Sequence, residues 1–242
     1  MEITSLTNTK VKQWAKLKEK KYRDQEKRFL VEGEHLIQEA VAADLVECVL
    51  VETGKRHAFT SYPVYEVTKD ILKKLSGSTS GTWIMAVCHM PSENTELGRR
   101  LIILDDVQDP GNVGTIIRTA LSFGYDAVLL SQRCADVYNE KVIRSTQGAL
   151  FHIPIIRGNI VELIQQIKKQ QIPVYVTSLH NAKPLKQITG SRQLALVFGN
   201  EGNGVSEEVL KLADEHVYIE MKTFESLNVA VAAGICMYQF SN

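Results

Sequence analysis

Residues 194–204 read Leu-Ala-Leu-Val-Phe-Gly-Asn-Glu-Gly-Asn-Gly, an uncharged apolar run that passes directly into a loop with three glycines. A short apolar run bounded by glycine is typical of a strand that is buried on both faces. Gly199, Gly202 and Gly204 allow the backbone to turn tightly or to approach a ligand closely. The segment therefore predicts a buried strand that ends in a glycine-rich loop.

A second strand and loop follow along the chain. Residues 217–221 predict a strand, and residues 226–240 predict an uncharged helix whose small side chains would allow close packing. Ser226 has the side chain of a helix N-cap. Open α/β sheets bind ligands where neighbouring strands end in loops. A glycine-rich loop after one strand, beside a loop that leads into a helix after the other, therefore predicts a ligand site.

The glycine spacing argues against two common nucleotide-binding loops. Gly199-x-x-Gly202-x-Gly204 is not G-x-G-x-x-G, and the sequence contains no G-x-x-x-x-G-K-[ST]. Taken alone, the loop fits a tight strand-to-helix connection equally well. A nucleotide-dependent oxidoreductase of the Rossmann type is therefore a poor alternative.

Composition places the chain among ordinary soluble proteins. A length of 242 residues predicts one large or two modest domains, and 44% hydrophobic with 23% charged residues is typical of a globular chain. The polar N-terminus is no secretory signal, and the uncharged C-terminal stretch is too polar and short for a membrane span. We therefore expect a cytoplasmic protein without a membrane partner.

The cysteines predict core residues rather than ligands. Cys48, Cys88, Cys134 and Cys236 are scattered without C-x-x-C pairing, and the six histidines lack ligand spacing. Such cysteines are typical of small buried side chains in a reducing compartment. We expect no metal site.

Charge is distributed unevenly although the formal net charge is zero. The first thirty residues carry nine basic and four acidic side chains, against 19 and 24 in the rest, so they are +5 and the remainder is −5. A charge run is more often a solvated helix face. The local excess nevertheless favours binding to a phosphate backbone. The predicted RNA-binding residues are Lys10, Lys12, Lys16, Lys18, Lys20, Lys21, Arg23 and Arg28.

The pattern of elements predicts two domains. Residues 1–92 indicate a small α/β unit, with helices at 8–23, 34–43 and 69–76, a strand and turn at 29–33, and strands at 46–51, 63–67 and 82–87. Residues 93–98 have linker composition. Residues 99–242 alternate strands and helices, which indicates a mostly parallel sheet with strands at 101–104, 127–131, 151–155, 173–178, 194–198 and 217–221.

A further segment carries an anion-binding pattern. Pro110-Gly111 stops one element, and a helix begins near Val113 with the spacing Asn112-x-Gly114-x-x-x-Arg118. Helical side chains lean toward the N-terminus, so Arg118 would lie back over Gly114. Free N–H groups at a helix start favour an anion. The segment therefore predicts a phosphate or carboxylate site, with a surface arginine as the simpler alternative.

Together these segments resemble a known family. The motifs Asn112-x-Gly114-x-x-x-Arg118, residues 198–204 (FGNEGNG) and residues 225–232 (ESLNVAVA) are similar, in order and spacing, to those of the SpoU/TrmH RNA ribose 2′-O-methyltransferases of the SPOUT superfamily. The lysine-rich opening resembles the substrate-binding domain of rRNA-modifying members. The resemblance covers nearly the whole chain, and three ordered motifs are far more specific than one.

The resemblance implies a fold and an assembly. The C-terminal domain would be a parallel sheet with a deep trefoil knot, preceded by a small RNA-binding domain akin to a ribosomal protein. S-adenosylmethionine would bind in the knot, at Gly199, Ile219, Met221 and Leu227. The chain would form a homodimer through its last helix. Its substrate would be rRNA rather than tRNA, and a non-catalytic RNA-binding protein is the alternative.

The resemblance also implies the reaction, in which a ribose 2′-hydroxyl attacks the methyl group of the cofactor. Family proposals make Arg118 the base, but a guanidinium stays protonated in proteins. We therefore expect Arg118 to clamp phosphate and to stabilise oxyanion charge. Asn112, Glu201, Ser226 and Asn228 would orient the ribose and the loops, with Glu201 as the alternative base. Residues 219–225 lack the proline and glycine usual in the family, which affects the expected cofactor contacts.

Overall fold

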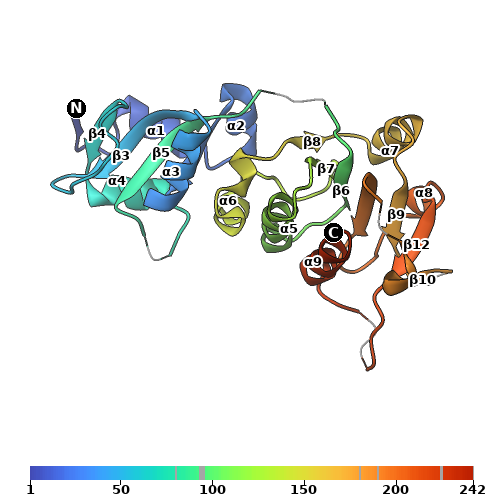
Figure 1. The fold of residues 1–242 in the computed structure, drawn as a ribbon. Coiled ribbons are helices and arrows are strands. Elements are labelled where there is room, and N and C mark those ends of the chain that lie inside the picture. Colours follow the sequence, from blue (N-terminus) through green and yellow to red (C-terminus); the bar gives the residue numbers. More distant parts are fainter. Residues whose placement is uncertain (80, 93–95, 180, 190, 224–225, 242) are drawn as a thin grey trace. The chain divides into compact units, whose positions relative to one another are not determined.

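The computed structural model describes residues 1–242 except 80, 93–95, 180, 190, 224–225 and 242. The chain forms two compact units (Figure 1). The first unit is Met1–Ser92 with Tyr138–Phe151, and the second is Glu93–Val137 with His152–Asn242. Of the linker expected at 93–98, residues 93–95 lie outside the described residues. The sequence did not anticipate that Tyr138–Phe151 belongs to the first unit.

The first unit is built on a mixed sheet. In the described part of the chain it has five strands in the order β1-β4-β3-β5-β2, with β3 parallel to β4 and antiparallel to β5. The strands are β1 (Glu2–Ile3), β2 (Arg28–Glu32), β3 (Val46–Glu52), β4 (Val64–Val67) and β5 (Ile84–His89). The helices are α1 (Thr9–Lys16), α2 (Lys20–Glu26), α3 (Glu34–Ala42), α4 (Lys69–Leu75), α6 (Glu140–Thr146) and η1 (Ala149–Phe151).

Two sets of buried side chains hold this unit together. Val11 and Trp14 of α1 pack with α4 and with β3, in a cluster that includes Leu50. Phe29 of β2 is fully buried, and its ring lies 4.8 Å from the ring of Tyr138 and 5.9 Å from that of Phe151. These ring contacts attach the later segment to the first sheet.

The single helix predicted over residues 8–23 is wrong, because the chain forms α1 and α2 with a break between them. Arg23 turns back from α2 and its Nη1 donates to the carbonyls of Leu17 and Lys18, over 2.8 and 2.7 Å. These bonds satisfy carbonyls at the end of α1 that a continuing helix would otherwise use. A polar sequence without glycine or proline gave no sign of this break.

The second unit is an α/β domain, as the strand and helix pattern predicted. Its sheet has seven strands within the described residues, in the order β10-β12-β9-β11-β6-β7-β8, and every pairing that is described is parallel. The strands are β6 (Arg100–Asp105), β7 (Ala127–Leu130), β8 (Ile155–Arg157), β9 (Val174–Thr177), β10 (Lys183–Pro184), β11 (Leu194–Gly199) and β12 (Glu215–Tyr218). The other elements are α5 (Pro110–Ser122), α7 (Ile160–Lys169), η2 (Leu185–Gln187), α8 (Glu207–Leu210) and α9 (Val229–Gln239).

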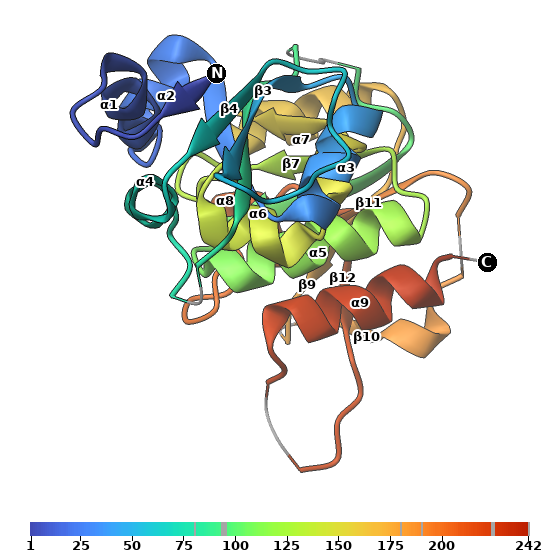
Figure 2. The same cartoon turned by 90° about the vertical axis from the view of Figure 1, so that its left-hand side faces the viewer.

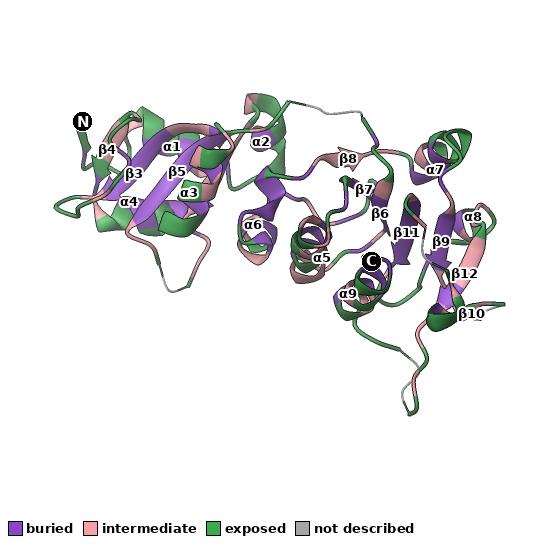
Figure 3. Ribbon diagram, in the orientation of Figure 1, coloured by how far each residue is buried: buried purple, intermediate pink, exposed green. Residues whose placement is uncertain are grey.

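Strand β11 lies at the centre of this sheet, between β9 and β6, and all of it is buried (Figure 3). One face of the sheet packs against α7 and α8, through a cluster that includes Ile164 and Val209. Helix α5 contacts β7 and α9 contacts β11, and these two helices lie side by side (Figure 2). With helices on both faces, the central strands can be apolar on both sides, which confirms the buried strand predicted at 194–198.

Two other predicted elements are shifted. The strand expected at 151–155 is β8, which begins at Ile155 because Pro154 has no N–H to give to the ladder. The strand expected at 217–221 is β12, which ends at Tyr218. The N-cap of α9 is Asn228 rather than Ser226, since the Asn228 side chain accepts from the N–H groups of the next turn. All four cysteines are free and buried, as predicted.

Candidate active site

The site is built where two neighbouring strands end. Because β6 and β11 pair in parallel, the loops that follow them meet at one edge of the sheet. Glu201 in the β11 loop accepts hydrogen bonds from the N–H groups of Gln108 and Asp109, over 3.3 and 3.2 Å, and from Asn112 Nδ2 over 3.0 Å. The glycine-rich loop is therefore fastened to the start of α5.

Asn112 connects this pair of loops to the last helix. Its Oδ1 accepts from Asn228 Nδ2 over 2.9 Å, while Asn228 Oδ1 accepts from the N–H groups of Ala230 and Val231 and caps α9. The orientation of Asn112 follows from the start of α5, where Asp109 is the N-cap and Pro110 follows it. A continuous chain of hydrogen bonds, Glu201–Asn112–Asn228, thus joins three distant segments.

The surroundings of Glu201 determine its charge. Its partial burial raises the pKa of the carboxyl group, but hydrogen bonds from the Asn112 side chain and from backbone amides outweigh burial, and the net pKa is lowered. The carboxylate is therefore ionised at neutral pH and already accepts three hydrogen bonds. This arrangement suits an orienting group better than a proton acceptor.

A cavity of about 710 Å³ opens beside these loops. It is lined by all four residues predicted to bind the cofactor, Gly199, Ile219, Met221 and Leu227, and also by Glu201, Ser226 and Asn228. Small-molecule sites have volumes of roughly 300–1,000 Å³, mostly apolar walls and a few polar groups. The structure therefore brings most of the predicted site residues to one ligand-sized cavity.

The two ends of the glycine-rich loop are in direct backbone contact. Asn200 and Gly204 exchange two N–H to carbonyl hydrogen bonds of 2.9 Å each. A β-carbon on Gly199 would lie 2.2 Å from the carbonyl carbon of Gly204 and from the nitrogen of Val205. Only glycine fits at that position, and the loop presents its backbone to the cavity.

Arg118 and Asn112 do not line this cavity. Asn112 still reaches it indirectly, through Glu201 and Asn228. Arg118 is exposed on α5, and its guanidinium forms no hydrogen bond or ion pair with any residue that the structure describes. Within one copy of the chain, the arginine is therefore separate from the other predicted site residues.

The predicted RNA-binding side chains fall into two groups. Six lysines are exposed on or beside α1 and α2: Lys10, Lys12, Lys16, Lys18, Lys20 and Lys21. Arg23 does not belong with them, because it is only 5% exposed and its guanidinium is bonded to backbone carbonyls. Arg28 forms ion pairs with Glu26 and Glu47, over 3.7 and 3.2 Å, so its charge is largely balanced.

Sequence reasoning missed one wall of the cavity. Thr177 at the end of β9 lines it, together with Ser178 and Leu179 directly after the strand. Strand β9 is the other neighbour of β11, but it comes before β11 in the sequence with no motif of its own. A prediction of strand order would have pointed to it, because it identifies which strand ends adjoin.

Comparison with known proteins identifies the family. Residues 99–238 match the SpoU rRNA Methylase family. The chain belongs to the SpoU rRNA methylase family. Residues 8–86 of this SpoU family member match the MRM3-like substrate binding domain.

Individual relatives match this SpoU family member along nearly its full length. The 23S rRNA (guanosine(2553)-2′-O)-methyltransferase RlmP of Bacillus subtilis is 41% identical, over 98% of each chain. A solved RNA 2′-O ribose methyltransferase superposes with a TM-score of 0.85 at 30% identity, covering 99% of this chain and 97% of the other. AviRb of Streptomyces viridochromogenes, solved with AdoMet, gives a TM-score of 0.88 at 26% identity over 97% of each. In the part of the chain that the structure describes, no helix has the length and apolarity to cross a membrane.

Proposed function

We propose that this protein transfers a methyl group from S-adenosylmethionine to a ribose 2′-hydroxyl of large-subunit rRNA. The observation that carries the proposal is the hydrogen-bonded chain Glu201–Asn112–Asn228, which joins the three family motifs beside a ligand-sized cavity. The relative RlmP, matched over 98% of each chain, is a 23S rRNA methyltransferase, which supports the choice of rRNA over tRNA.

The cavity fits the cofactor in size and chemistry. Gly199 would allow close approach of a ligand to the backbone of the loop, and Ile219, Met221 and Leu227 would contact its apolar parts. S-adenosylmethionine, when bound, supplies the activated methyl group. Titration with S-adenosylmethionine tests the site directly, including the effect of the unusual 219–225 segment, of which residues 224–225 lie outside the described residues.

The protein supplies alignment and charge. Ser226, Asn228 and Asn112 would orient the ribose and the loops. Arg118 would bind a substrate phosphate and stabilise the oxyanion that develops as the hydroxyl passes its proton to water. Glu201 would hold the loop and the start of α5 together, because its lowered pKa makes it a weak base.

A homodimer would bring Arg118 to a cavity. Helix α9 and the residue before its cap expose apolar side chains: Leu227, Val231, Ile235 and Tyr238, with exposures of 39, 52, 39 and 66%. Contiguous apolar surface of this kind marks interfaces, and a two-fold interface uses the same patch on both chains. Since α5 lies beside α9, the unpaired Arg118 of each copy would complete the cavity of the other.

The remaining family features belong to the same proposal. Residues 1–92 would be the RNA-binding domain, akin to a ribosomal protein, and residues 99–242 the methyltransferase domain. The segment that ends in α9 would pass through a loop as a trefoil knot, an exception to the usual absence of knots. A hydrogen bond of 2.6 Å from Arg100 Nη2 to the carbonyl of Phe240 ties the end of α9 to β6, so the C-terminal segment is attached to the sheet. Four free thiols and an rRNA substrate support a cytoplasmic protein.

Methyl transfer from labelled S-adenosylmethionine tests the proposal. The purified protein is incubated with 23S rRNA, 16S rRNA and tRNA, and the methylated positions are mapped by their resistance to alkaline cleavage. We expect label in 23S rRNA at one ribose. RNA binding without label in any of the three would instead establish a non-catalytic RNA-binding protein. Label confined to tRNA would reassign the substrate.

A further inference from the structure

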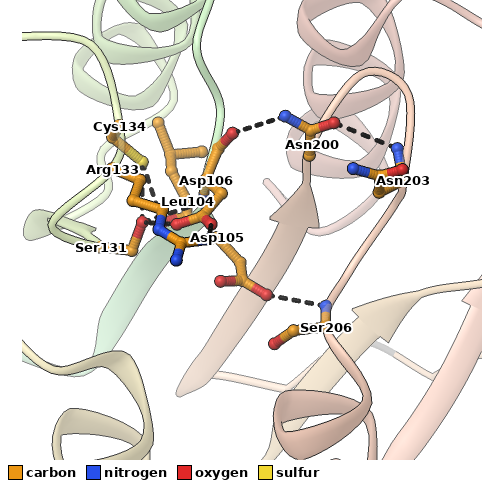
Figure 4. Close-up of polar contacts among 9 residues, drawn as sticks. All are labelled: Leu104, Asp105, Asp106, Ser131, Arg133, Cys134, Asn200, Asn203 and Ser206. Atoms are coloured by element: carbon orange, nitrogen blue, oxygen red, sulfur yellow. Dashed lines mark hydrogen bonds and ion pairs between the residues drawn. The ribbon is translucent and has the colours of Figure 1, made fainter.

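The glycine-rich loop is held by Asp105, the last residue of β6, and by Asp106, which follows it. Asn200 Nδ2 donates to the carbonyl of Asp106 over 2.9 Å, and the N–H of Ser206 donates to Asp105 Oδ2 over 2.8 Å (Figure 4). Inside the loop, Asn200 Oδ1 accepts from the N–H groups of Gly202 and Asn203. One asparagine side chain therefore links the shape of the loop to the position of Asp106.

Asp106 has an uncommon backbone conformation. Its φ of 59° lies in the left-handed region, which aspartate tolerates better than most residues but which still requires support. Ser131 gives that support, because its Oγ donates to Asp106 Oδ1 over 2.5 Å and accepts from the N–H of Asp106 over 2.9 Å. Ser131 is 7% exposed. A single buried hydroxyl thus holds both the side chain and the backbone of Asp106.

The loop that carries Ser131 is held in turn by Arg157 of β8. The Arg157 guanidinium donates to the carbonyls of Ser131, Cys134 and Ala135, over 2.8, 2.9 and 2.6 Å. A planar guanidinium can direct several N–H groups at once, which a lysine ammonium cannot reproduce in the same geometry. By comparison, the ion pair of 3.6 Å from the exposed Arg133 to Asp106 contributes little.

We propose that Ser131 and Arg157 are positioning residues for the cofactor loop, acting through Asp106 and Asn200. Neither lines the cavity, and nothing in the three motifs includes them. The link crosses the edge of the sheet from β8 to the β7 loop, then to the end of β6 and to the β11 loop. That S-adenosylmethionine is the ligand rests on the proposed function; the control of loop geometry does not.

Hydrogen–deuterium exchange in the ligand-free protein tests the inference. Ser131→Ala removes both bonds to Asp106, and Arg157→Lys removes the fork that holds the Ser131 loop. In each variant we expect the backbone amides of peptides covering residues 199–206 to exchange about fivefold faster. This factor corresponds to the net free energy that one hydrogen bond contributes. Peptides from α7 should be unchanged. Ser145→Ala is the matched control, since its hydroxyl donates to a helix carbonyl in the first unit.

A double-mutant cycle tests whether the effect runs through Asn200. Asn200→Asp keeps an oxygen for the amides of Gly202 and Asn203 but removes the donor to Asp106. We expect Ser131→Ala and Asn200→Asp each to raise the Kd for S-adenosylmethionine about fivefold, and the double variant to be no weaker than the weaker single variant. Arg157→Lys should raise the Kd in the same direction.

Two results would overturn the inference: unchanged exchange at 199–206 in the variants, or effects that multiply in the double variant. If Ser131→Ala does not fold, as judged by circular dichroism, Arg157→Lys is judged by the same exchange criterion and by its own cycle with Asn200→Asp. If the native protein fails to bind S-adenosylmethionine while the variants still exchange faster, the proposed function fails and the positioning role stands.

Discussion

The side-chain amide of Asn228 donates to Asn112 Oδ1 over 2.9 Å, although 116 positions separate the two residues. Asn228 also caps α9 with its other side-chain atom. One side-chain atom of Asn228 therefore caps the helix, and the other bonds across the candidate site to Asn112. Substitutions can separate the two, because aspartate retains the capping oxygen and loses the amide donor.

We expect Asn228→Asp to keep the cap and to lower kcat, while Asn228→Ala loses both. Loss of an asparagine cap costs about 1 kcal/mol, so only the alanine variant should melt clearly earlier. Thermal unfolding and methyl-transfer kinetics on the same preparations check this. Equal activity of Asn228→Asp and the native protein would show that the bond to Asn112 is not needed for the reaction.

Glu201 should stabilise the fold in a pH-dependent way. Its pKa is lowered in the folded protein, so its contribution is present above its ordinary value near 4.5 and is lost as the pH falls through the lower folded value. Melting temperatures of the native protein and Glu201→Gln should differ at pH 7 and converge toward pH 3. Glu208→Gln, an exposed carboxylate on α8, is the control and should show no such convergence. A constant difference across this range would refute the assignment.

Gly199→Ala should disrupt the cavity. The new β-carbon would lie 2.2 Å from backbone atoms of Gly204 and Val205, which cannot move as a flexible side chain would. We expect a destabilisation of about 1–3 kcal/mol, typical of overpacking, with loss of cofactor binding in calorimetry. Gly202→Ala is the stability control, since its β-carbon would meet Asn200 Oδ1 at an ordinary 3.5 Å. Similar melting temperatures for both variants would contradict the prediction.

Arg118→Ala should lower kcat by about 10²–10³, the usual effect of removing one oxyanion-stabilising group, with the Kd for S-adenosylmethionine unchanged. We expect unchanged affinity because Arg118 is proposed to contact the substrate phosphate and the oxyanion rather than the cofactor. Mixing Arg118→Ala with Gly199→Ala should restore about a quarter of native activity if subunits exchange at random and sites are shared. Failure of the mixture, despite confirmed exchange, would place the arginine in its own chain's site.

The exposed face of α9 should control assembly. Ile235→Asp places a charge on the apolar stripe, and we expect a monomer in analytical ultracentrifugation with little methyl transfer. Leu6→Asp makes the same change at an exposed leucine of the first unit and should leave the oligomeric state unaltered. A dimeric Ile235→Asp protein would indicate that another surface forms the interface.

Much of the fold was readable because apolar patterning is local. The buried strand at 194–198 became β11, and the parallel sheet was inferred from alternating elements. The predicted element boundaries were wrong where a contact outside the local sequence pattern, or a backbone group, determines where an element begins or ends. The first helix is interrupted within a continuous polar pattern, where the side chain of Arg23 bonds to the carbonyl of Leu17. Strand β8 begins only after Pro154, although a proline can also be the first residue of a strand.

Motif spacing pointed to most of the residues that line the candidate site, and the others depend on strand order, which was not predicted. Gly199, Ile219, Met221 and Leu227 share the cavity because motifs at adjacent strand ends converge. Nothing in the sequence showed that Ser131 would bond to Asp106, since that contact depends on β7 lying next to β6. Arg118 illustrates a different limit, because the proposal that it acts in the cavity of a second copy cannot be read from contacts within one chain.

Phe29 packs against Tyr138 and Phe151, so the first unit draws one of its walls from much later in the chain. A fragment that stops at residue 92 would leave this fully buried ring in contact with water. Residues 1–92 are consequently not an independent domain that could be fused unchanged to another enzyme. Any transplant would have to carry the later aromatic segment with it.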